Sequence, residues 1–333
     1  MIPLSSRFCF PVRDWACAAF LVWLIGLTRA QLPAAPAPLW VETKGQADEY
    51  TVYHQRQKIL VYATSPRQFK PYVKELYTLQ DYNVLRDAPL DHLHHHALMY
   101  GIRVNGLNFW EETSGCGVQK PIALLKQESG MNAQGLPQIM LRQLIHWVTP
   151  ADAFLPDTTP VALLIEQRTL TLTVDQAQQE VALHWQSDFQ VGAKTNHVTL
   201  TGANYHGLGL RFQKELDPVA AHFNSESRPD LSGNKQDVSP HKWGAVSFEL
   251  PGKKATVVLF GSQDNARGHA NFFTMRTPFA YLSATQGLDQ EPLVYRSGDK
   301  FQLNYLITVY PEVKTVEFIQ QRQRAWEAAI RTP

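Results

Sequence analysis

The residues of this sequence best suited to chemistry lie in the segment 91–97, which reads "DHLHHHA". It holds four of the chain's twelve histidines, at positions 92, 94, 95 and 96. Histidine titrates near neutral pH, so it serves as a general acid or base, and its neutral ring also binds Zn²⁺ and Cu²⁺. The segment therefore predicts either a proton-transfer site or a metal site.

The strand that would carry these histidines is predicted from the turn that follows them. Asn105-Gly106 is the strongest short signal for a β-hairpin, and it lies between "ALMYGIRV" and "LNFWEE". A two-residue turn at this point pairs Tyr100 with Glu111 and His96 with Gly115. We therefore expect the histidines at the far end of a hairpin strand.

A regular strand would sort the histidines by face, because side chains two residues apart point the same way. His92, His94 and His96 would then share one face, and His95 would lie on the other. Glu111 shares the face of His96 but lies roughly 13 Å along the strand, too far for a hydrogen bond. A regular hairpin therefore does not make Glu111 the direct partner of His96.

The sequence leaves several interpretations of the cluster open. Three imidazoles on one face could hold Zn²⁺ or Cu²⁺ and leave a position for water, so a divalent metal ion is a candidate cofactor. A cupin-type metal site would need a glutamate shortly afterwards, where this sequence has "LMYG". As general acid and base, histidines typically contribute about 10²–10⁴-fold each. A solvated strand edge is the third interpretation.

The rest of the chain reads as β-strands with one clear helix. Segments such as "LTLTV" at 170–174 alternate apolar and polar residues, as strands with one buried face do. No series of amphipathic helices separates them, so we expect an all-β fold, a large antiparallel β-sandwich. Residues 313–330 are predicted to form a C-terminal helix and 66–76 a shorter one. The polar segment 223–244 is predicted to be a functional or mobile loop.

The first thirty residues are predicted to be a signal peptide. Arg7 and Arg13 precede an apolar run that ends before Ala30 and is short for a membrane span. The mature chain, residues 31–333, is then a single secreted or periplasmic β-sandwich domain with no membrane span. Removing three basic residues and one acidic residue leaves 28 Lys and Arg against 29 Asp and Glu. This balance argues against nucleic-acid binding.

Other motifs narrow the choice of enzyme class. Cys9 and Cys17 lie in the predicted signal peptide, which leaves Cys116 without a partner for an internal disulfide. The sequence contains no GxSxG, no Gly-rich phosphate loop followed by a helix, no CxxC and no HExxH. A serine hydrolase, a nucleotide enzyme and a zinc protease are therefore disfavoured.

On its histidine motif the chain resembles the PmoA-like family, secreted bacterial proteins of unknown function. Residues 91–112 are similar to the signature Asp-His-Pro-His-His-x-Gly-Leu-x-Phe followed by Asn-Gly-x-x-Phe-Trp. The matching residues are Asp91, His92, His94, His95, Leu98, Asn105, Gly106, Phe109 and Trp110. Leu93 replaces the proline, Ala97 replaces the glycine, and His96 stands where a basic residue is expected.

Two further segments extend the resemblance over most of the chain. "YHGLGLRF" at 205–212 matches a second family segment. "LFGSQDNARGHANFF" at 259–273 occupies a third, in which Asn265 and Arg267 match. The resemblance implies a β-sandwich, of the galactose-mutarotase-like kind, in a domain of unknown function. It implies no established reaction.

The candidate site residues come from these three segments. The candidate catalytic residues are His92, His94, His95 and His206. The candidate substrate-binding residues are Asp91, Tyr205, Arg211, Asn265, Arg267 and His269. His94 and His95 lie on opposite faces of a regular strand, so His92, His94 and His206 form the simplest catalytic set. Arg211 could hold a carboxylate or an anionic sugar, and Tyr205 could stack on a sugar ring.

These residues predict a secreted enzyme that acts on a carbohydrate or a sugar-derived small molecule. Histidine acid/base chemistry would transfer a proton at carbon or at a glycosidic oxygen, in hydrolysis, elimination or epimerisation. One alternative is a metalloenzyme with the same histidines as ligands. Another is a non-catalytic glycan-binding sandwich, without convergence of histidines. The sequence does not define the oligomeric state.

Overall fold

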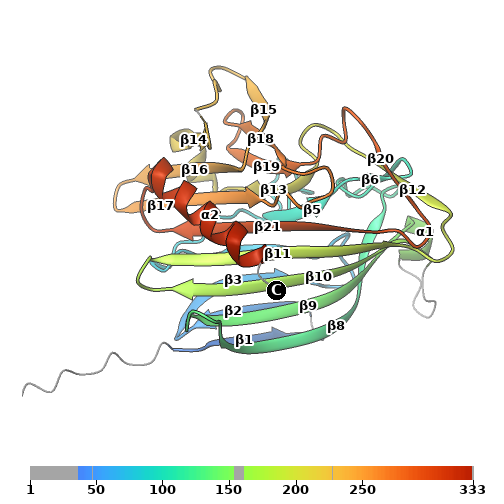
Figure 1. Ribbon diagram of the computed structural model, residues 1–333, viewed down its shortest axis with the longest axis horizontal. Coiled ribbons are helices and arrows are strands. Elements are labelled where there is room, and N and C mark those ends of the chain that lie inside the picture. Colours follow the sequence, from blue (N-terminus) through green and yellow to red (C-terminus); the bar gives the residue numbers. More distant parts are fainter. Residues whose placement is uncertain (1–36, 47, 154–160, 227, 332–333) are drawn as a thin grey trace, which may run out of the picture. The chain divides into compact units, whose positions relative to one another are not determined.

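A computed structural model describes residues 37–46, 48–153, 161–226 and 228–331 (Figure 1). The predicted signal peptide at 1–30 lies outside these residues. Within the described ranges the chain forms two large antiparallel sheets, a small third sheet and a C-terminal helix. The predicted all-β sandwich with a C-terminal helix is therefore confirmed. Residues Pro36–Pro333 form one compact unit.

The first sheet has nine strands in the order β1-β2-β3-β4-β5-β13-β19-β18-β15. They are β1 (Leu39–Lys44), β2 (Glu49–His54), β3 (Gln57–Ala63), β4 (Tyr72–Leu76), β5 (Leu98–Gly101), β13 (Gly207–Arg211), β15 (Gln236–Pro240), β18 (Asn271–Met275) and β19 (Tyr281–Thr285). The central strands β5, β13 and β19 pair antiparallel, although they are far apart in the sequence. This sheet brings the first and second motif segments side by side.

The second sheet has eight strands in the order β14-β16-β17-β21-β11-β10-β9-β8. They are β8 (Val118–Met131), β9 (Pro137–Val148), β10 (Ala162–Asp175), β11 (Glu180–Val191), β14 (Ala221–Asn224), β16 (Trp243–Leu250), β17 (Lys253–Gly261) and β21 (Lys300–Tyr310). The small sheet has the order β20-β12-β6-β7, with β6 (Arg103–Val104), β7 (Leu107–Asn108), β12 (His197–Thr201) and β20 (Leu293–Arg296). The helical segments are α1 (Pro150–Ala153), the 3₁₀ helix η1 (Lys214–Val219) and α2 (Val316–Arg331).

The main core lies between the two large sheets because their strands alternate. In β9 and β10, buried residues alternate with partly exposed ones along most of the strand. The buried side chains of one sheet meet those of the other, so that Trp185 shares a cluster with Leu98 and Leu208. Burial of this apolar surface is the main contribution to stability.

One ion pair lies inside this core. Glu166 and Arg168 stand two residues apart on β10, both fully buried, with their charged atoms 2.8 Å apart. Arg168 also donates a hydrogen bond of 2.7 Å to the backbone oxygen of Pro71, just before β4 in the other sheet. The pair therefore connects the two layers.

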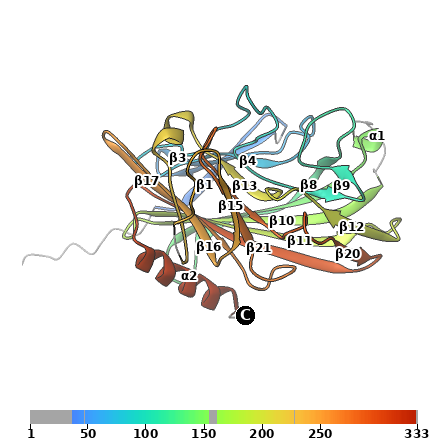
Figure 2. The ribbon, with the colours of Figure 1, turned by 90° about the horizontal axis from the view of Figure 1, so that it is seen from above.

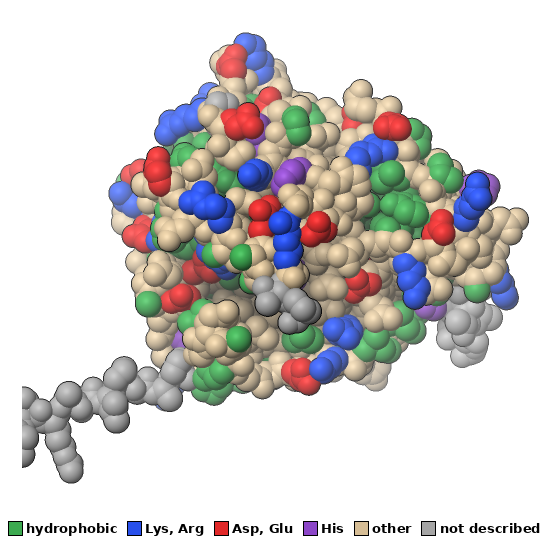
Figure 3. All heavy atoms as spheres, viewed as in Figure 1, with side chains coloured by type: hydrophobic (Ala, Val, Ile, Leu, Met, Phe, Trp, Pro, Cys, Tyr) green, Lys and Arg blue, Asp and Glu red, His purple; other side chains and the backbone are tan. Residues whose placement is uncertain are grey.

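Helix α2 covers the outer face of the eight-stranded sheet (Figures 1 and 2). Ile319 and Trp326 on the helix pack with Phe260 and Leu306 on the strands. Basic and acidic side chains are interspersed on the face drawn in Figure 3. No described helix is long and apolar enough to cross a membrane.

Two local predictions are wrong. Residues 66–76 form no helix, because their second half is strand β4, which pairs with β3. The segment 223–244 is not one open loop, because β15 runs through it and pairs with β18 at the edge of the nine-stranded sheet. In both segments the backbone hydrogen bonds of a neighbouring strand replace the local preference.

The outer face of the nine-stranded sheet carries a second apolar layer. Leu208 and Leu210 point into the main core, so Gly209 and Arg211 face outward from β13. The outer layer contains Ala63, Tyr72, Met99, Trp110, Phe273, Met275, Phe279 and Tyr281, with Tyr205 packed against it. The motif residues gather on this face.

Candidate active site

The histidine segment is a loop, not a strand. Strand β5 begins only at Leu98, and residues 88–97 fold back through a hydrogen bond of 3.0 Å from Ala88 N to His95 O. Ala88 and Ala97 bound this loop with positive φ angles of 42° and 43°, a region that alanine rarely adopts. The predicted strand with alternate histidines on one face is therefore wrong.

The predicted hairpin at 105–106 is present, but it has only two residue pairs, between β6 and β7. It ends because Asn108 Oδ1 accepts hydrogen bonds of 2.8 and 3.2 Å from the backbone N–H groups of Trp110 and Glu111. These local bonds turn the chain out of the ladder. The predicted pairs of Tyr100 with Glu111 and of His96 with Gly115 do not form, and β5 pairs with β13 and β4 instead.

The loop brings three of its four imidazoles together. The ring centroids of His92 and His95 are 4.6 Å apart, as are those of His94 and His95. The centroids of His92 and His94 are 5.8 Å apart. His94 and His95 thus enter the same site, because the loop redirects side chains that a strand would separate.

Two of these imidazoles lie beside carboxylates. His92 Nδ1 is 3.1 Å from Asp91 Oδ2, and His94 Nδ1 is 3.3 Å from Glu111 Oε2. A carboxylate in this position orients the ring and stabilises the imidazolium that forms when the ring takes a proton. The arrangement provides two oriented proton carriers within reach of one small substrate.

Burial favours the uncharged forms of His94 and His95. It lowers the pKa of His94, although Glu111 acts in the opposite direction. It lowers the pKa of His95 to about 2, and the neighbouring His94 and His92 add to the effect. Both rings are uncharged at neutral pH. His94 can therefore accept a proton, whereas His95 stays neutral and forms part of the wall.

The fourth histidine belongs to a buried network below the loop. His96 Nδ1 is 2.7 Å from Asp87 Oδ1, and His96 Nε2 is 3.0 Å from Glu112 Oε2. Lys70 lies 2.5 Å from the other Glu112 oxygen and donates to the Trp110 backbone oxygen at 3.0 Å. Because both ring nitrogens face carboxylates, only the imidazolium satisfies both. Burial opposes this charge, but the carboxylates outweigh it and raise the pKa of His96.

This network, Lys70–Glu112–His96–Asp87, holds the two segments that carry the site. Asp87 and His96 form a backbone bridge that closes the base of the loop. Glu112 fixes the chain next to Glu111, the partner of His94. The His96 ring also stacks on Tyr72, with centroids 4.2 Å apart. The network therefore sets the distance between the histidine loop and its carboxylate.

Trp110 forms the floor of the site. Its ring lies 5.9 Å from that of His95 and 6.5 Å from that of Tyr281. Gly209 leaves room for both aromatic rings, because a Cβ there would lie 1.9 Å from the Tyr281 hydroxyl and 3.2 Å from the Trp110 ring. A glycine at this position of β13 is thus required for the floor to form.

His206 also packs against Trp110. The His206 and Trp110 rings stack with centroids 5.0 Å apart and an interplanar angle of 14°. Burial lowers the pKa of His206 to about 3, with Arg103 and His94 contributing. Tyr205 packs edge-on against the same two rings. Tyr205 and His206 therefore both support Trp110, the floor of the site.

Arg211 lies at the edge of this floor. Its guanidinium carbon is 3.3 Å from the centre of the Phe279 ring, and its Nη2 donates to Asp91 Oδ2 at 3.0 Å. The Phe279 ring in turn contacts His92, with centroids 5.0 Å apart. The predicted binding residues Asp91 and Arg211 thus join the histidines.

Several buried polar atoms here have no hydrogen-bond partner within the described chain. These atoms are His95 Nδ1, Trp110 Nε1, His206 Nδ1, Tyr281 Oη, and Arg211 Nε and Nη1. We call these five residues the donor patch. Most buried polar groups in proteins are hydrogen bonded, so their concentration on one face indicates a place where a polar ligand binds.

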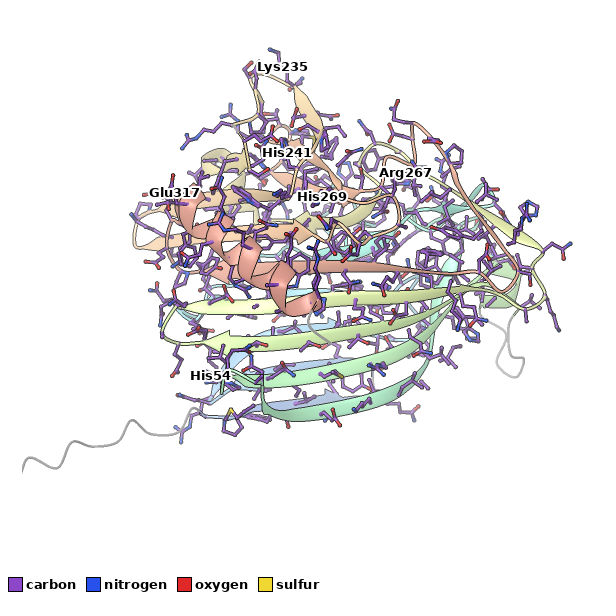
Figure 4. All side chains as sticks on the ribbon, in the orientation of Figure 1. His54, Lys235, His241, Arg267, His269 and Glu317 are labelled. Atoms are coloured by element: carbon purple, nitrogen blue, oxygen red, sulfur yellow. The ribbon has the colours of Figure 1, made fainter. Side chains whose placement is uncertain are left out.

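The third segment contributes residues to other parts of the fold. Asn265 exchanges hydrogen bonds of 3.1 and 2.6 Å with the backbone of Asn304. Arg267 donates to backbone oxygens within residues 286–292, at distances from 2.7 to 3.3 Å. His269 lines a separate hollow near helix α2 (Figure 4). The structure does not bring these three predicted binding residues to the histidine loop.

Another hollow also lies away from the histidine loop. A groove of about 860 Å³ runs between helix α2 and the outer face of the eight-stranded sheet, lined by residues such as Thr171, His184 and Trp326. None of the predicted site residues lines it. As the side chains of the described ranges lie, no group of three or more His, Cys, Asp or Glu is arranged to hold a metal ion.

Comparison with known proteins places the chain in a family. Residues 49–323 match the model of a "Family of unknown function (DUF6807)". The chain belongs to the DUF6807 family. The expected membership of a family of unknown function is thus confirmed, although under this name and not as PmoA-like. No curated protein matches this DUF6807 chain.

The solved structures similar to this chain include two α-galactosidases and a galactose mutarotase related enzyme. The GH36 α-galactosidase AgaB of Geobacillus stearothermophilus is 12% identical, with a TM-score of 0.48 over 82% of this chain and 41% of that one. The Lactobacillus brevis α-galactosidase is 8% identical, with a TM-score of 0.42 over 82% and 39%. A galactose mutarotase related enzyme of Lactobacillus acidophilus is 10% identical, with a TM-score of 0.35 over 83% and 100%. The DUF6807 chain spans about two fifths of both galactosidases, and similarity at this level assigns it no activity.

Some residues of the site were not anticipated from the sequence of this DUF6807 protein. They are Lys70, Asp87, Glu111 as the partner of His94, Glu112, Phe279 and Tyr281. The pair Glu111-Glu112 directly follows the matched "NFW", so its place beside the motif was a usable signal. The other residues reach the site only through sheet pairing that no local pattern reveals.

Proposed function

We propose that this DUF6807 protein is an enzyme that transfers protons on a carbohydrate or sugar-derived small molecule through His92 and His94. The observation that supports this proposal is the pairing of each ring with a carboxylate, Asp91 or Glu111, at 3.1 and 3.3 Å. The two ring centroids are 5.8 Å apart, so one substrate can meet both.

His94 is the base in this proposal, because its ring is uncharged at neutral pH. It takes a proton from a C–H group of the sugar or from water, and Glu111 stabilises the imidazolium. His92, held by Asp91, supplies a proton as the acid. In hydrolysis or elimination that proton goes to the oxygen whose C–O bond breaks, and in epimerisation it returns to carbon on the opposite face.

The walls of the site support a small polar substrate. Trp110 and Phe279 form a buried aromatic layer beneath the histidine loop, and the donor patch provides hydrogen-bonding groups within it. Apolar and aromatic walls with a few convergent polar groups are typical of small-molecule sites. A glycan-binding module would instead expose its aromatic rings on the surface, whereas Trp110 and Tyr281 are buried.

We further propose that the protein is exported and is related to PmoA-like proteins. The charged start, the short apolar run and Ala30 support export, and the histidine motif supports the relationship. Mass spectrometry of the exported protein should find a mature chain that begins near Gln31. An intact Met1 would overturn the proposed cleavage, and a membrane-bound form would overturn release of the mature chain.

The enzyme proposal is tested by the substitution His94→Ala. A screen of oxidised and unmodified glycosides for product release identifies a substrate, and the variant should then lose about 10²–10⁴-fold in rate. The fold should persist, because His94 lies on a loop and its side chain is partly exposed. His197→Ala, an exposed histidine on β12, is the matched control and should keep full activity.

Metal content is measured on the same samples. Equal metal content in wild type and His94→Ala, together with loss of activity, supports acid/base chemistry. Loss of a stoichiometric metal with the activity supports the metalloenzyme instead. A well-folded His94→Ala protein with undiminished turnover would exclude both and favour the glycan-binding module.

A further inference from the structure

Half of the unpaired atoms in the donor patch can only donate hydrogen bonds. Trp110 Nε1 and the two free nitrogens of Arg211 can only donate hydrogen bonds, whereas His95, His206 and Tyr281 can donate or accept. None of these atoms must act as an acceptor. A ligand that fits such a surface presents acceptors, and a carboxylate is a sugar substituent that only accepts.

Arg211 is the one charged member of the patch. Its side chain is 2% exposed, and its guanidinium lies against the Phe279 ring at 3.3 Å. Leaving two of its N–H groups unpaired in this environment is costly, because a buried donor without a partner loses its hydration. The same Phe279 ring touches His92, with centroids 5.0 Å apart, so Arg211 lies one ring away from the histidines.

Asp91 shows how a carboxylate lies at this position. Its Oδ2 is shared between Arg211 Nη2 at 3.0 Å and His92 Nδ1 at 3.1 Å. The Asp91 side chain is 44% exposed, so solvent screens this pair and a ligand carboxylate can compete with it. The free Nε and Nη1 on either side of Nη2 are donors that such a ligand would gain.

We propose that the substrate carries a carboxylate, as in a uronic or aldonic acid unit, and that Arg211 binds this carboxylate in exchange with Asp91. The inference rests on the proposed function, because it names the substrate class of the same site. Arginine suits this role because its planar guanidinium holds a carboxylate by two parallel hydrogen bonds.

A carboxylate at Arg211 selects among the reactions open to the histidines. The C–H bond next to a carboxylate is the acidic one in a sugar acid, and Arg211 stabilises the negative charge that develops when its proton leaves. In elimination His94 takes that proton, and the electron pair forms the C=C bond. The C–O bond at the next carbon then breaks, and its oxygen takes a proton from His92. In epimerisation the same carbon regains a proton on its other face.

The test compares acids with their neutral amides. Glucuronate, galacturonate and mannuronate are titrated into the full protein by calorimetry, each beside its uronamide, which keeps the shape and removes the charge. At least one acid should bind about ten-fold more tightly than its amide, as expected for a charge-assisted pair. Arg211→Gln should abolish this preference.

A second variant tests the inference even if Arg211→Gln does not fold. Asp91→Asn removes the competing carboxylate from an exposed loop position and should increase acid affinity several-fold, while uronamide affinity stays constant.

Three outcomes overturn the inference: no acid binds at millimolar concentration, the amides bind as well as the acids, or Asp91→Asn weakens acid binding. Its failure is distinct from failure of the proposed function, since His94-dependent turnover of neutral glycosides would remain. Conversely, Arg211-dependent acid binding without turnover would support a binding site and not an enzyme.

Discussion

His96 provides the sharpest test of how the site is held together, because its ring joins two carboxylates in a nearly buried place. We expect His96→Gln to destabilise the fold and His96→Arg to preserve it. Glutamine cannot carry the positive charge that Asp87 and Glu112 both face, at 2.7 and 3.0 Å. Arginine can, and the family resemblance places a basic residue at this position.

The size of the effect follows from burial. The His96 side chain is 11% exposed and Glu112 is 18% exposed, so solvent replaces little of the lost interaction. Breaking one side of a buried charge network costs about 3 kcal/mol. For a domain of this size that corresponds to a fall in Tm of about 5 °C.

The pH dependence gives the test a second readout. The folded pKa of His96 lies above its ordinary value of 6.5, so its contribution is fully present below that value and is lost as pH rises through the folded pKa. Wild type should therefore lose stability relative to His96→Arg on the alkaline side. Below pH 6 the two proteins should respond to pH in parallel.

Urea unfolding followed by tryptophan fluorescence, from pH 5 to pH 9, measures these differences directly. His96→Gln should also reduce turnover of any substrate that depends on His94, because Glu111 loses its anchored neighbour. A His96→Gln protein as stable as wild type at pH 7 would refute the reasoning. So would a constant difference between wild type and His96→Arg across the whole range.

Three further outcomes are expected. Ala88→Gly should stabilise the protein by about 1 kcal/mol, since glycine relieves the positive φ of 42°, and an unchanged or lower urea midpoint would contradict the strain. Gly209→Ala should destabilise it by about 1–3 kcal/mol and alter the near-ultraviolet circular dichroism of Trp110, whereas Gly130→Ala, which meets open space, should do neither. Stability should fall below about pH 6.5, because His95 and His206 titrate in the unfolded chain but stay neutral when folded, with pKa values of about 2 and 3. Equal urea midpoints at pH 7 and pH 5.5 would argue against buried neutral rings.

Much of the architecture could be predicted because strand alternation is a local signal. The pattern in β10 follows directly from one face meeting the core, and α2 follows from apolar residues at helical spacing. The segment 66–76 shows the limit of such signals. Pro71 interrupts the predicted helix, and the edge of β3 offers backbone hydrogen bonds that only the folded sheet reveals.

The site was predictable in its members but not in its geometry. The motifs pointed to His92, His95 and Arg211, which the structure brings together around Phe279. A single side-chain amide, Asn108 Oδ1, ends the hairpin early and moves Glu111 toward His94. Ala97 has a φ angle of 43°, a conformation that glycine adopts easily. This angle accounts for the glycine that the family signature has at this position. Hydrophobic periodicity alone predicts neither the early end of the hairpin nor the positive φ angle of Ala97.

The buried Glu166–Arg168 pair also bears on how the two sheets find each other during folding. A collapsed chain with the layers misaligned would keep the ion pair with Glu166 but bury Arg168 Nη1 without the Pro71 oxygen, leaving a donor without an acceptor. Such an intermediate is penalised by about 1–3 kcal/mol, whereas purely apolar faces would tolerate a slide of one residue. We therefore expect docking of the layers to be a late and cooperative step. Replacing both residues by apolar ones should leave a sandwich that folds with less discrimination among competing alignments.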